Sequence, residues 1–139
     1  MSVDVSRGPQ PDLDSAPFWD GLRRHAVIVQ ECDDCGRRRF GRLGSCPYCG
    51  VPGGTDVEVA GTGTVYSFVR IHRALTPEMA GEVPYTVGTI DLDGPAAGVA
   101  GPRLLGRVEP AGDVAIGSRV RPTFVDHPSW TELRFVVEP

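Results

Sequence analysis

Hydrophobic and polar positions alternate through most of the chain after residue 55, which is the pattern of strands that bury one face. Turn-rich segments of glycine, proline, aspartate and serine separate these runs. The first run contains Gly61 and Gly63, where a strand can bend sharply to serve both halves of a closed sheet. The pattern predicts a mostly β protein with a five-stranded OB-type barrel, or an SH3-like barrel as the alternative. The strands are expected over residues 57–71, 85–92, 104–108, 120–124 and 133–137.

The first fifty residues lack this alternation. Residues 1–13 are polar and carry prolines, with almost nothing to bury, so we expect a flexible lead. A boundary is predicted at the turn-forming sequence VPGG, residues 51–54. The chain therefore divides into a lead over residues 1–13, a helical and metal-binding segment over 14–54, and the barrel over 55–139.

A short helix is predicted after the lead. Ser15 is a candidate N-cap, Pro17 lies in the first turn, and two arginines follow at the C-terminal end, as helices prefer. A helix of this length is unstable alone, so its apolar stripe must pack against this chain or another. The stripe consists of Phe18, Trp19 and Leu22.

The four cysteines of the chain follow the spacing Cys-x2-Cys-x10-Cys-x2-Cys, at Cys32, Cys35, Cys46 and Cys49. A glycine follows each pair and allows the backbone to turn so that the thiolates converge on one ion. Strands are expected over residues 26–30 and 37–42, beside the first pair. Four thiolates make a closed tetrahedral site, which is structural rather than catalytic. Two disulfides are the alternative, but these need an oxidising compartment, and the first twenty residues resemble no signal peptide.

The ligands alone do not choose between zinc and iron, because rubredoxin-type iron sites use the same thiolates. We expect one zinc ion per chain, since electron transfer would not require the remaining residues, whereas a structural zinc stabilises a segment too small to fold alone. The longest aliphatic run, residues 26–29, is far too short to span a membrane. A cytoplasmic protein is expected.

Basic residues concentrate around the metal site. All 14 basic residues are arginines, which excludes a lysine Schiff base or a lysine general base in this chain. Residues 21–50 hold six arginines and three acids, a charge of +3, which leaves −7 for the rest to reach the net −4. The cluster could offset the negative zinc tetrathiolate, bind phosphate, or face an acidic partner. Its members beside the cysteines are Arg37, Arg38, Arg39 and Arg42.

In order, the chain presents the aromatic helix, the two cysteine pairs, the stretch GTGTVYSF at residues 61–68 and RLLG at residues 103–106. Over about residues 17–137 this order resembles a family of acyl-CoA-associated proteins that join a rubredoxin-like zinc ribbon to an OB fold, long catalogued as a domain of unknown function. Many members carry prolines between the two cysteine pairs, where this chain reads FGRLG at residues 40–44. This departure leaves open whether the ribbon tip contacts substrate here.

The resemblance implies a small non-catalytic subunit that binds a thiolase-fold enzyme in a hetero-oligomer. Such partners include ketoacyl-CoA thiolases, an acyltransferase and the aldol lyases of steroid side-chain degradation. The resemblance also implies that the four cysteines bind zinc and that the arginine cluster can meet the phosphates of a coenzyme A thioester shared with the partner. Phe18, Trp19 and Leu22 become candidate docking residues. The long connection over residues 75–84 is a candidate gate, or simply a mobile loop.

Two other functions remain as alternatives. Zinc ribbons and OB barrels also bind nucleic acids, but a pI near 5.3, the lack of lysine and the few aromatic residues argue against this. A rubredoxin-like electron carrier would contain iron. Thiolase chemistry needs a free cysteine, and all four cysteines here are assigned to metal, so we do not expect the chain itself to be a thiolase.

Overall fold

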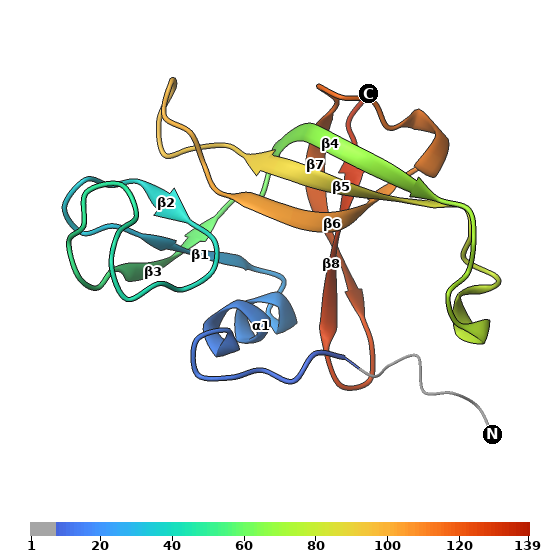
Figure 1. The fold of residues 1–139 in the computed structure, drawn as a ribbon, viewed down its shortest axis with the longest axis horizontal. Coiled ribbons are helices and arrows are strands. Elements are labelled where there is room, and N and C mark those ends of the chain that lie inside the picture. Colours follow the sequence, from blue (N-terminus) through green and yellow to red (C-terminus); the bar gives the residue numbers. More distant parts are fainter. Residues whose placement is uncertain (1–7) are drawn as a thin grey trace.

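The computed structural model describes residues 8–139, so most of the predicted lead lies outside the described residues. The structure has two lobes, a zinc ribbon and a barrel, which lie side by side (Figure 1). A short helix, α1 (Ala16–Arg23), lies below them. The hairpin of the last two barrel strands descends beside this helix. The two lobes are therefore joined by the chain between them and by the helix.

The barrel contains five strands, as predicted. These close in the order β4-β5-β6-β8-β7, with β4 hydrogen-bonded to β7 to complete the ring. All neighbours are antiparallel except β6 and β8, which are parallel. Short 3-10 helices, η1 (Pro77–Met79) and η2 (Ala111–Asp113), lie in two of the connections. The strands are β4 (Gly63–Ile71), β5 (Tyr85–Leu92), β6 (Arg103–Glu109), β7 (Arg119–Asp126) and β8 (Thr131–Val137).

The strand predicted over residues 57–71 is wrong as a single strand, because the structure divides it in two. Its first half, β3 (Thr55–Val59), pairs with β1 (Val27–Glu31) in the ribbon sheet, and its second half is β4 of the barrel. The chain changes sheets at Gly61, whose φ is +78°. A Cβ atom at this position would lie 2.9 Å from Pro122, so glycine is strongly preferred here. The glycine thus ends one strand rather than bending it.

The ribbon sheet has the order β2-β1-β3. The strand predicted over residues 37–42 is reduced to β2 (Arg38–Arg39), which pairs with Gln30 and Glu31 of β1. After Arg39 the chain leaves the sheet in a bend, because the backbone must turn toward the second cysteine pair. The ribbon is therefore held by β1, which pairs on both sides.

Helix α1 forms where predicted, but Ser15 does not cap it with its side chain. The Ser15 hydroxyl instead accepts a hydrogen bond from the backbone N–H of Asp12 at 3.0 Å, so it closes the preceding turn. Gly21 lets the helix approach β1 closely, since a Cβ there would lie 2.4 Å from Ile28 Cγ1. No helix in residues 8–139 is long and apolar enough to cross a membrane.

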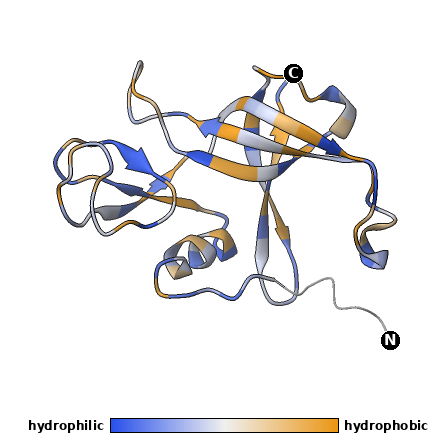
Figure 2. Ribbon diagram, viewed as in Figure 1, coloured by the Kyte–Doolittle hydropathy of each residue, from blue (hydrophilic) through white to orange (hydrophobic). Residues whose placement is uncertain are grey.

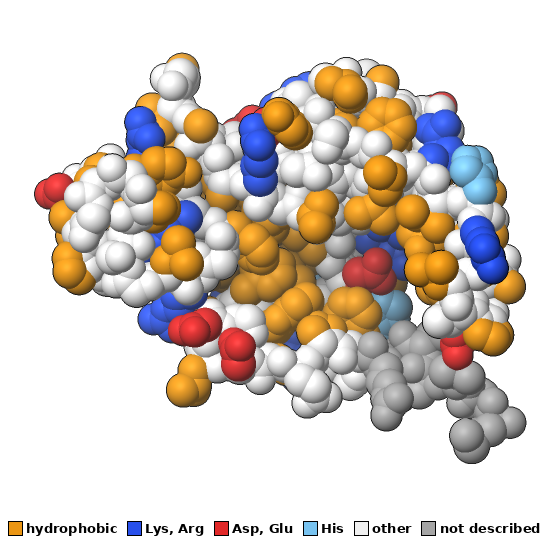
Figure 3. Space-filling view, in the orientation of Figure 1, with side chains coloured by type: hydrophobic (Ala, Val, Ile, Leu, Met, Phe, Trp, Pro, Cys, Tyr) orange, Lys and Arg blue, Asp and Glu red, His pale blue; other side chains and the backbone are white. Residues whose placement is uncertain are grey.

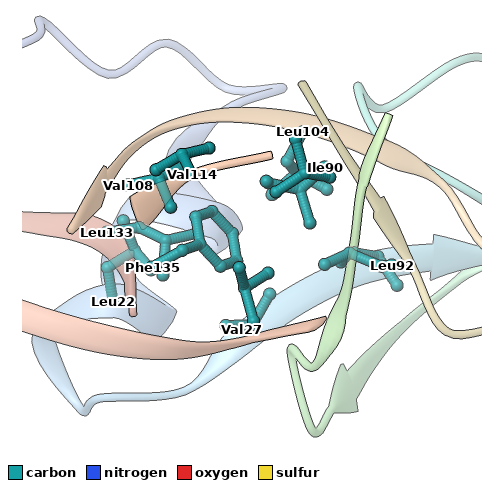
Figure 4. Packing of buried hydrophobic residues seen from close by; sticks show 12 residues of the cluster. Leu22, Val27, Ile90, Leu92, Leu104, Val108, Val114, Leu133 and Phe135 are labelled. Atoms are coloured by element: carbon teal, nitrogen blue, oxygen red, sulfur yellow. The ribbon is translucent and has the colours of Figure 1, made fainter. Parts of the chain in front are cut away.

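One hydrophobic core connects the lobes. Phe135 lies fully buried inside the barrel, and Leu22 of α1 and Val27 of β1 join the same cluster (Figure 4). Hydrophobic residues follow the barrel strands and the helix, whereas β2 is hydrophilic (Figure 2). The helix and the ribbon strand β1 are consequently packed on the barrel through apolar contacts within this chain.

Candidate metal centre and aromatic hollow

The four cysteines meet at the tip of the ribbon, as predicted. Each pair forms a tight turn in which the glycine N–H bonds back to the first cysteine: Gly36 to the Cys32 carbonyl at 3.1 Å, and Gly50 to the Cys46 carbonyl at 2.9 Å. Both glycines have positive φ. All four Sγ atoms lie within 4.8 Å of one another. The two turns therefore bring four thiols to one point.

This donor set fits a tetrahedral zinc ion. A Zn–S bond of about 2.3 Å places tetrahedral sulfurs about 3.8 Å apart, and the Cys32–Cys49 and Cys35–Cys46 Sγ pairs are separated by 3.6 and 3.7 Å. Cys32 and Cys46 are buried, whereas Cys35 and Cys49 are exposed. With four protein ligands no coordination position is left for a substrate, so the metal would hold shape rather than perform chemistry.

Backbone N–H groups in the turns favour the thiolate form that binds metal. The N–H groups of Asp34 and Cys35 both point at Cys32 Sγ at 3.4 Å, and backbone hydrogen bonding lowers the pKa of Cys32. Burial raises the pKa of Cys46, but hydrogen bonds from the backbone of Cys49 and Tyr48 and from the neighbouring thiols outweigh that effect and lower it to about 6. A backbone hydrogen bond lowers the pKa of Cys49, but burial and hydrogen bonding among the thiols outweigh it and raise this pKa to about 12. The turns therefore favour anionic sulfur at the first cysteine of each pair.

Arg39 is buried in the ribbon. The residue is 4% exposed. It donates from Nε to Gln30 Oε1 at 2.6 Å and from Nη2 to the carbonyls of Gly53 at 2.6 Å and Leu43 at 3.3 Å. No acidic side chain forms an ion pair with it among residues 8–139. This placement does not favour the predicted contact between Arg39 and coenzyme A, because the side chain turns inward and ties the loops of the ribbon to β1.

The other three arginines of the cluster lie outside the core. Arg38 forms an ion pair with Glu31 at 3.0 Å, and the guanidinium of Arg37 lies over the ring of Tyr48 at 4.7 Å. Arg42 is exposed. A phosphate contact by these three stays a prediction, and Arg37 and Arg42 are the more available because Arg38 is already paired.

A second site, which we call the aromatic hollow, lies between the helix, the ribbon and the barrel. Figure 3 shows an apolar depression in this position. It measures about 360 Å³. Leu22 is fully buried in its floor, so the structure leaves that residue no surface for docking a partner, contrary to the prediction. The lining residues are Phe18, Trp19, Leu22, Phe40, Thr89, Arg103, Leu104, Leu105, Trp130, Glu132 and Leu133.

Four aromatic rings in edge-to-face contact form one side of the aromatic hollow. Phe18 contacts Phe40 of the ribbon at 4.8 Å and Trp19 at 5.0 Å between ring centroids, and Trp19 contacts Trp130 of the β7–β8 hairpin at 6.1 Å. Such pairs add stability beyond the area they bury. Sequence reasoning identified Phe18 and Trp19 but missed Phe40 and Trp130, because no periodic signal links residues so far apart in the chain.

The hairpin tip is fastened to the end of the helix. His25 Nε2 lies 3.0 Å from each carboxylate oxygen of Asp126, and its ring stacks on Phe124 at 4.8 Å. Arg23 donates to the carbonyl of Ser129 at 2.7 Å. The His25 contact lowers the pKa of Asp126. These bonds tie the hairpin that carries Trp130 to the end of α1, beside the contact between Trp130 and Trp19.

The connection over residues 75–84 lies at the opposite end of the barrel from the ribbon (Figure 1). Leu75 is 87% exposed, and Glu82 accepts from Arg107 Nη2 at 2.7 Å. A gate at this position stays a prediction.

Two domains of a known protein family match this chain. The rubredoxin-like zinc-ribbon domain of ChsH2 matches residues 19–53, and the C-terminal OB-fold domain of ChsH2 matches residues 56–125. The chain belongs to the ChsH2 zinc-ribbon and OB-fold family. The predicted resemblance is confirmed, as is the fold class.

Two curated relatives are longer proteins. The chain is 33% identical over 139 residues to the 3-oxo-4,17-pregnadiene-20-carboxyl-CoA hydratase alpha subunit of Mycobacterium tuberculosis, with 94% of this chain but 40% of that protein covered. It is 34% identical over 86 residues to a probable enoyl-CoA hydratase alpha subunit of Thermomonospora curvata, with 60% and 26% covered. The chain therefore spans less than half the length of these relatives.

Two solved structures share the fold. A chain of the Ltp2–ChsH2 (DUF35) aldolase superimposes with a TM-score of 0.76 at 28% identity, covering 94% of this chain and 98% of that one. A DUF35-family protein of unknown function from Sulfolobus solfataricus gives a TM-score of 0.58 at 22% identity, covering 88% and 83%. The second likeness concerns the fold alone.

Proposed function

We propose that this chain is a non-catalytic accessory subunit that binds a thiolase-like enzyme and helps to form or stabilise its acyl-CoA site. The observation that carries the proposal is the match, over nearly the whole of both chains, to a chain of the Ltp2–ChsH2 aldolase. Of the reactions such a partner could run, retro-aldol cleavage is favoured by that likeness. Thiolysis and acyl transfer are the other two.

The chemistry of this chain supports a role without catalysis. All four cysteines converge on the metal site, and the chain has no lysine. Two of its three histidines are committed to carboxylates at the hairpin, His25 to Asp126 and His127 to Glu132. Acyl transfer through a covalent intermediate commonly uses an activated cysteine or lysine, and the chain offers no lysine and no cysteine outside the metal site. The partner would therefore supply the reacting groups.

The hydratase activity in the names of the curated relatives is not carried over. Those proteins extend well beyond the part that this chain matches. What the shared part supports is a module for acyl-CoA enzymes that holds one structural zinc ion. We place it in the cytoplasm, because a tetrathiolate zinc site requires thiols that are kept reduced.

The proposal is tested by purifying the tagged chain from its native lysate at low and at high salt. Stoichiometric partners are identified by mass spectrometry, and metal content is measured on the same sample. We expect a thiolase-fold protein that remains bound, with one zinc per chain. Bound nucleic acid without a protein partner would contradict the proposal, as would a red, iron-containing preparation with a reversible redox couple.

A second step separates accessory from catalytic roles. The chain and the recovered partner are produced separately and assayed alone and together for retro-aldol cleavage, thiolysis and acyl transfer of acyl-CoA substrates. We expect activity only when the partner is present, with a marked increase when this chain is added. Turnover by this chain alone would refute its non-catalytic role.

A further inference from the structure

We propose that a cleft between α1 and the ribbon sheet receives an arginine side chain from the thiolase-like partner. This acidic cleft, as we call it, is lined by the turn before α1, the first residues of the helix, strands β1 and β3 and the loop after β2. The inference rests on the proposed function and adds to it a docking surface and the chemistry of the segment that occupies it. The cysteines of the metal site take no part in the lining.

The floor of the acidic cleft is apolar and encloses about 310 Å³. This volume lies at the lower end of the range of about 300–1,000 Å³ for ligand pockets, which suits one inserted side chain. Phe40 is 43% exposed, so apolar surface remains uncovered here, and covering it is favourable. The apolar lining consists of Pro17, Phe18, Trp19, Ile28 and Phe40.

Three carboxylates stand on the rim of this apolar floor. They belong to Asp12, Asp14 and Asp56, all of them exposed. None of the three forms an ion pair within residues 8–139. One cation, the exposed Arg42, also lines the acidic cleft. The lining therefore carries an excess of negative charge, and Figure 3 shows acidic side chains below the ribbon lobe.

Local bonds hold the rim in place without a partner. Asp12 Oδ1 accepts a hydrogen bond from the backbone N–H of Ser15 at 2.7 Å, and the Ser15 hydroxyl accepts one from the N–H of Asp12 at 3.0 Å. The Ser15 N–H holds the pKa of Asp12 below its ordinary value, so this carboxylate is ionised at neutral pH. Across the acidic cleft, Asp56 lies opposite Gln30 in the β1–β3 ladder. A rim that is ordered before binding loses little conformational freedom when a partner arrives.

Helix chemistry explains only part of this charge. Acids before a helix stabilise its N-terminal dipole, which accounts for Asp12 and Asp14. It does not account for Asp56, which reaches the rim from β3. Nor does it account for Glu58, an exposed acid on the same face of β3, opposite Ile28. Acids from two separate elements thus meet around one apolar cleft, and a cation between them relieves their mutual repulsion.

Arginine fits the acidic cleft better than other side chains. Its aliphatic stem can lie along the apolar floor while the charged end stays at the rim. Its planar guanidinium stacks on aromatic rings such as those of Phe18 and Phe40, and binds carboxylates through two parallel hydrogen bonds. Lysine offers a compact, strongly hydrated charge that does neither as well. The same carboxylates repel a phosphate, so a basic protein segment is the occupant we assign.

Charge variants of the zinc-loaded full chain test the inference against the thiolase-like partner recovered by capture. Asp14→Lys and Asp56→Lys reverse a rim charge, and Asp56→Asn removes one without reversing it. Asp113→Lys is the matched control, because Asp113 is exposed in η2, outside the acidic cleft, and forms no ion pair within the described residues. Circular dichroism and zinc content check folding. We expect each reversal to weaken partner binding about tenfold or more, Asp56→Asn to weaken it less, and Asp113→Lys to leave it unchanged.

A peptide provides a probe that does not depend on the partner. The full chain labelled with nitrogen-15 is titrated with acetyl-Leu-Arg-Leu-amide, and the same peptide with citrulline, the uncharged analogue of arginine, is the control. We expect amide shifts at Asp14 and Asp56 and a shift of the Trp19 indole signal with the arginine peptide. The citrulline peptide should leave these signals in place.

If the partner is recovered, the variants decide. Unchanged binding by Asp14→Lys and Asp56→Lys, or an equal loss with Asp113→Lys, would overturn the inference and leave the accessory function standing. If no thiolase-like partner is recovered, the accessory function is lost and the peptide alone decides; equal shifts with both peptides, or none, would then overturn the inference. If light scattering shows that the two reversals change self-association but not partner binding, the occupant is a second copy of this chain and the inference is wrong.

Discussion

Replacing Arg39 by methionine is expected to destabilise the ribbon strongly, although the residue lies in a cluster that charge alone would assign to ligand binding. Methionine fills the space of the aliphatic part of the arginine and removes the guanidinium. It removes hydrogen bonds of 2.6 Å to Gln30 and 2.6 Å to Gly53, and a weaker one of 3.3 Å to Leu43.

The magnitude follows from those bonds. A hydrogen bond from a charged group contributes about 1.5–3 kcal/mol, so the two short ones give roughly 3–6 kcal/mol. Removing a buried cation that has no acidic partner in the described chain offsets part of this loss. We therefore expect the free energy of unfolding to fall by about 2–4 kcal/mol.

The assay is urea unfolding followed by far-ultraviolet circular dichroism at one fixed concentration of free zinc, because bound metal adds to the apparent stability. Zinc transfer to a coloured chelator provides a second readout, and we expect it to be faster in the variant. Arg37→Met is the control, since Arg37 is exposed and contacts Tyr48 from outside; a loss below about 1 kcal/mol is expected there.

The reasoning would be refuted by an Arg39→Met variant with the wild-type stability and zinc release rate. It would also be refuted if Arg37→Met proved the more damaging change. Weaker binding of coenzyme A in Arg39→Met without a loss of stability would restore the phosphate-binding role that the buried side chain argues against.

Three further outcomes are expected. Gly21→Ala should lower stability by about 1–3 kcal/mol, because the new methyl group meets Ile28 at 2.4 Å, whereas Gly112→Ala has nothing within 4 Å and should be neutral in the same thermal unfolding experiment. Arg119 holds the pKa of Asp93 below its ordinary value, so this pair stabilises the fold above about pH 5 and the contribution is lost as pH falls through the carboxyl range and below. The stability difference between wild type and Asp93→Asn should accordingly shrink in acid, and a difference that is constant down to about pH 2 would contradict it. Chelation of zinc should increase amide hydrogen exchange in the ribbon before the barrel; equal exchange in the two lobes would argue that the metal does not hold the ribbon.

Local chemistry was readable from the sequence. The cysteine spacing predicted the metal site, because each turn places its two thiols through bonds within four residues. Alternation predicted the five barrel strands, because the pleat of a strand sends successive side chains to opposite faces. The bounds of β5 were predicted as the structure has them, since its burial alternates along its whole length.

Whatever depends on contacts between distant residues was decided by the tertiary structure. The sequence pattern could not reveal that β3 pairs with β1, since an alternating strand is compatible with either sheet and its first half joined the ribbon. Nor could it separate Arg39 from its neighbours, because burial depends on where the loops around Leu43 and Gly53 fold back.

The aromatic hollow shows the same division most clearly. Aromatic residues at 18 and 19 were recognisable as an apolar face that needed a partner, and the sequence alone determined that much. Which residues complete that face was settled by folding, which brings Phe40 of the ribbon and Trp130 of the last hairpin against them. Hydrophobic burial is non-directional, so a sequence pattern predicts only that a side chain will be buried. The residues that bury it are known only from the packed structure.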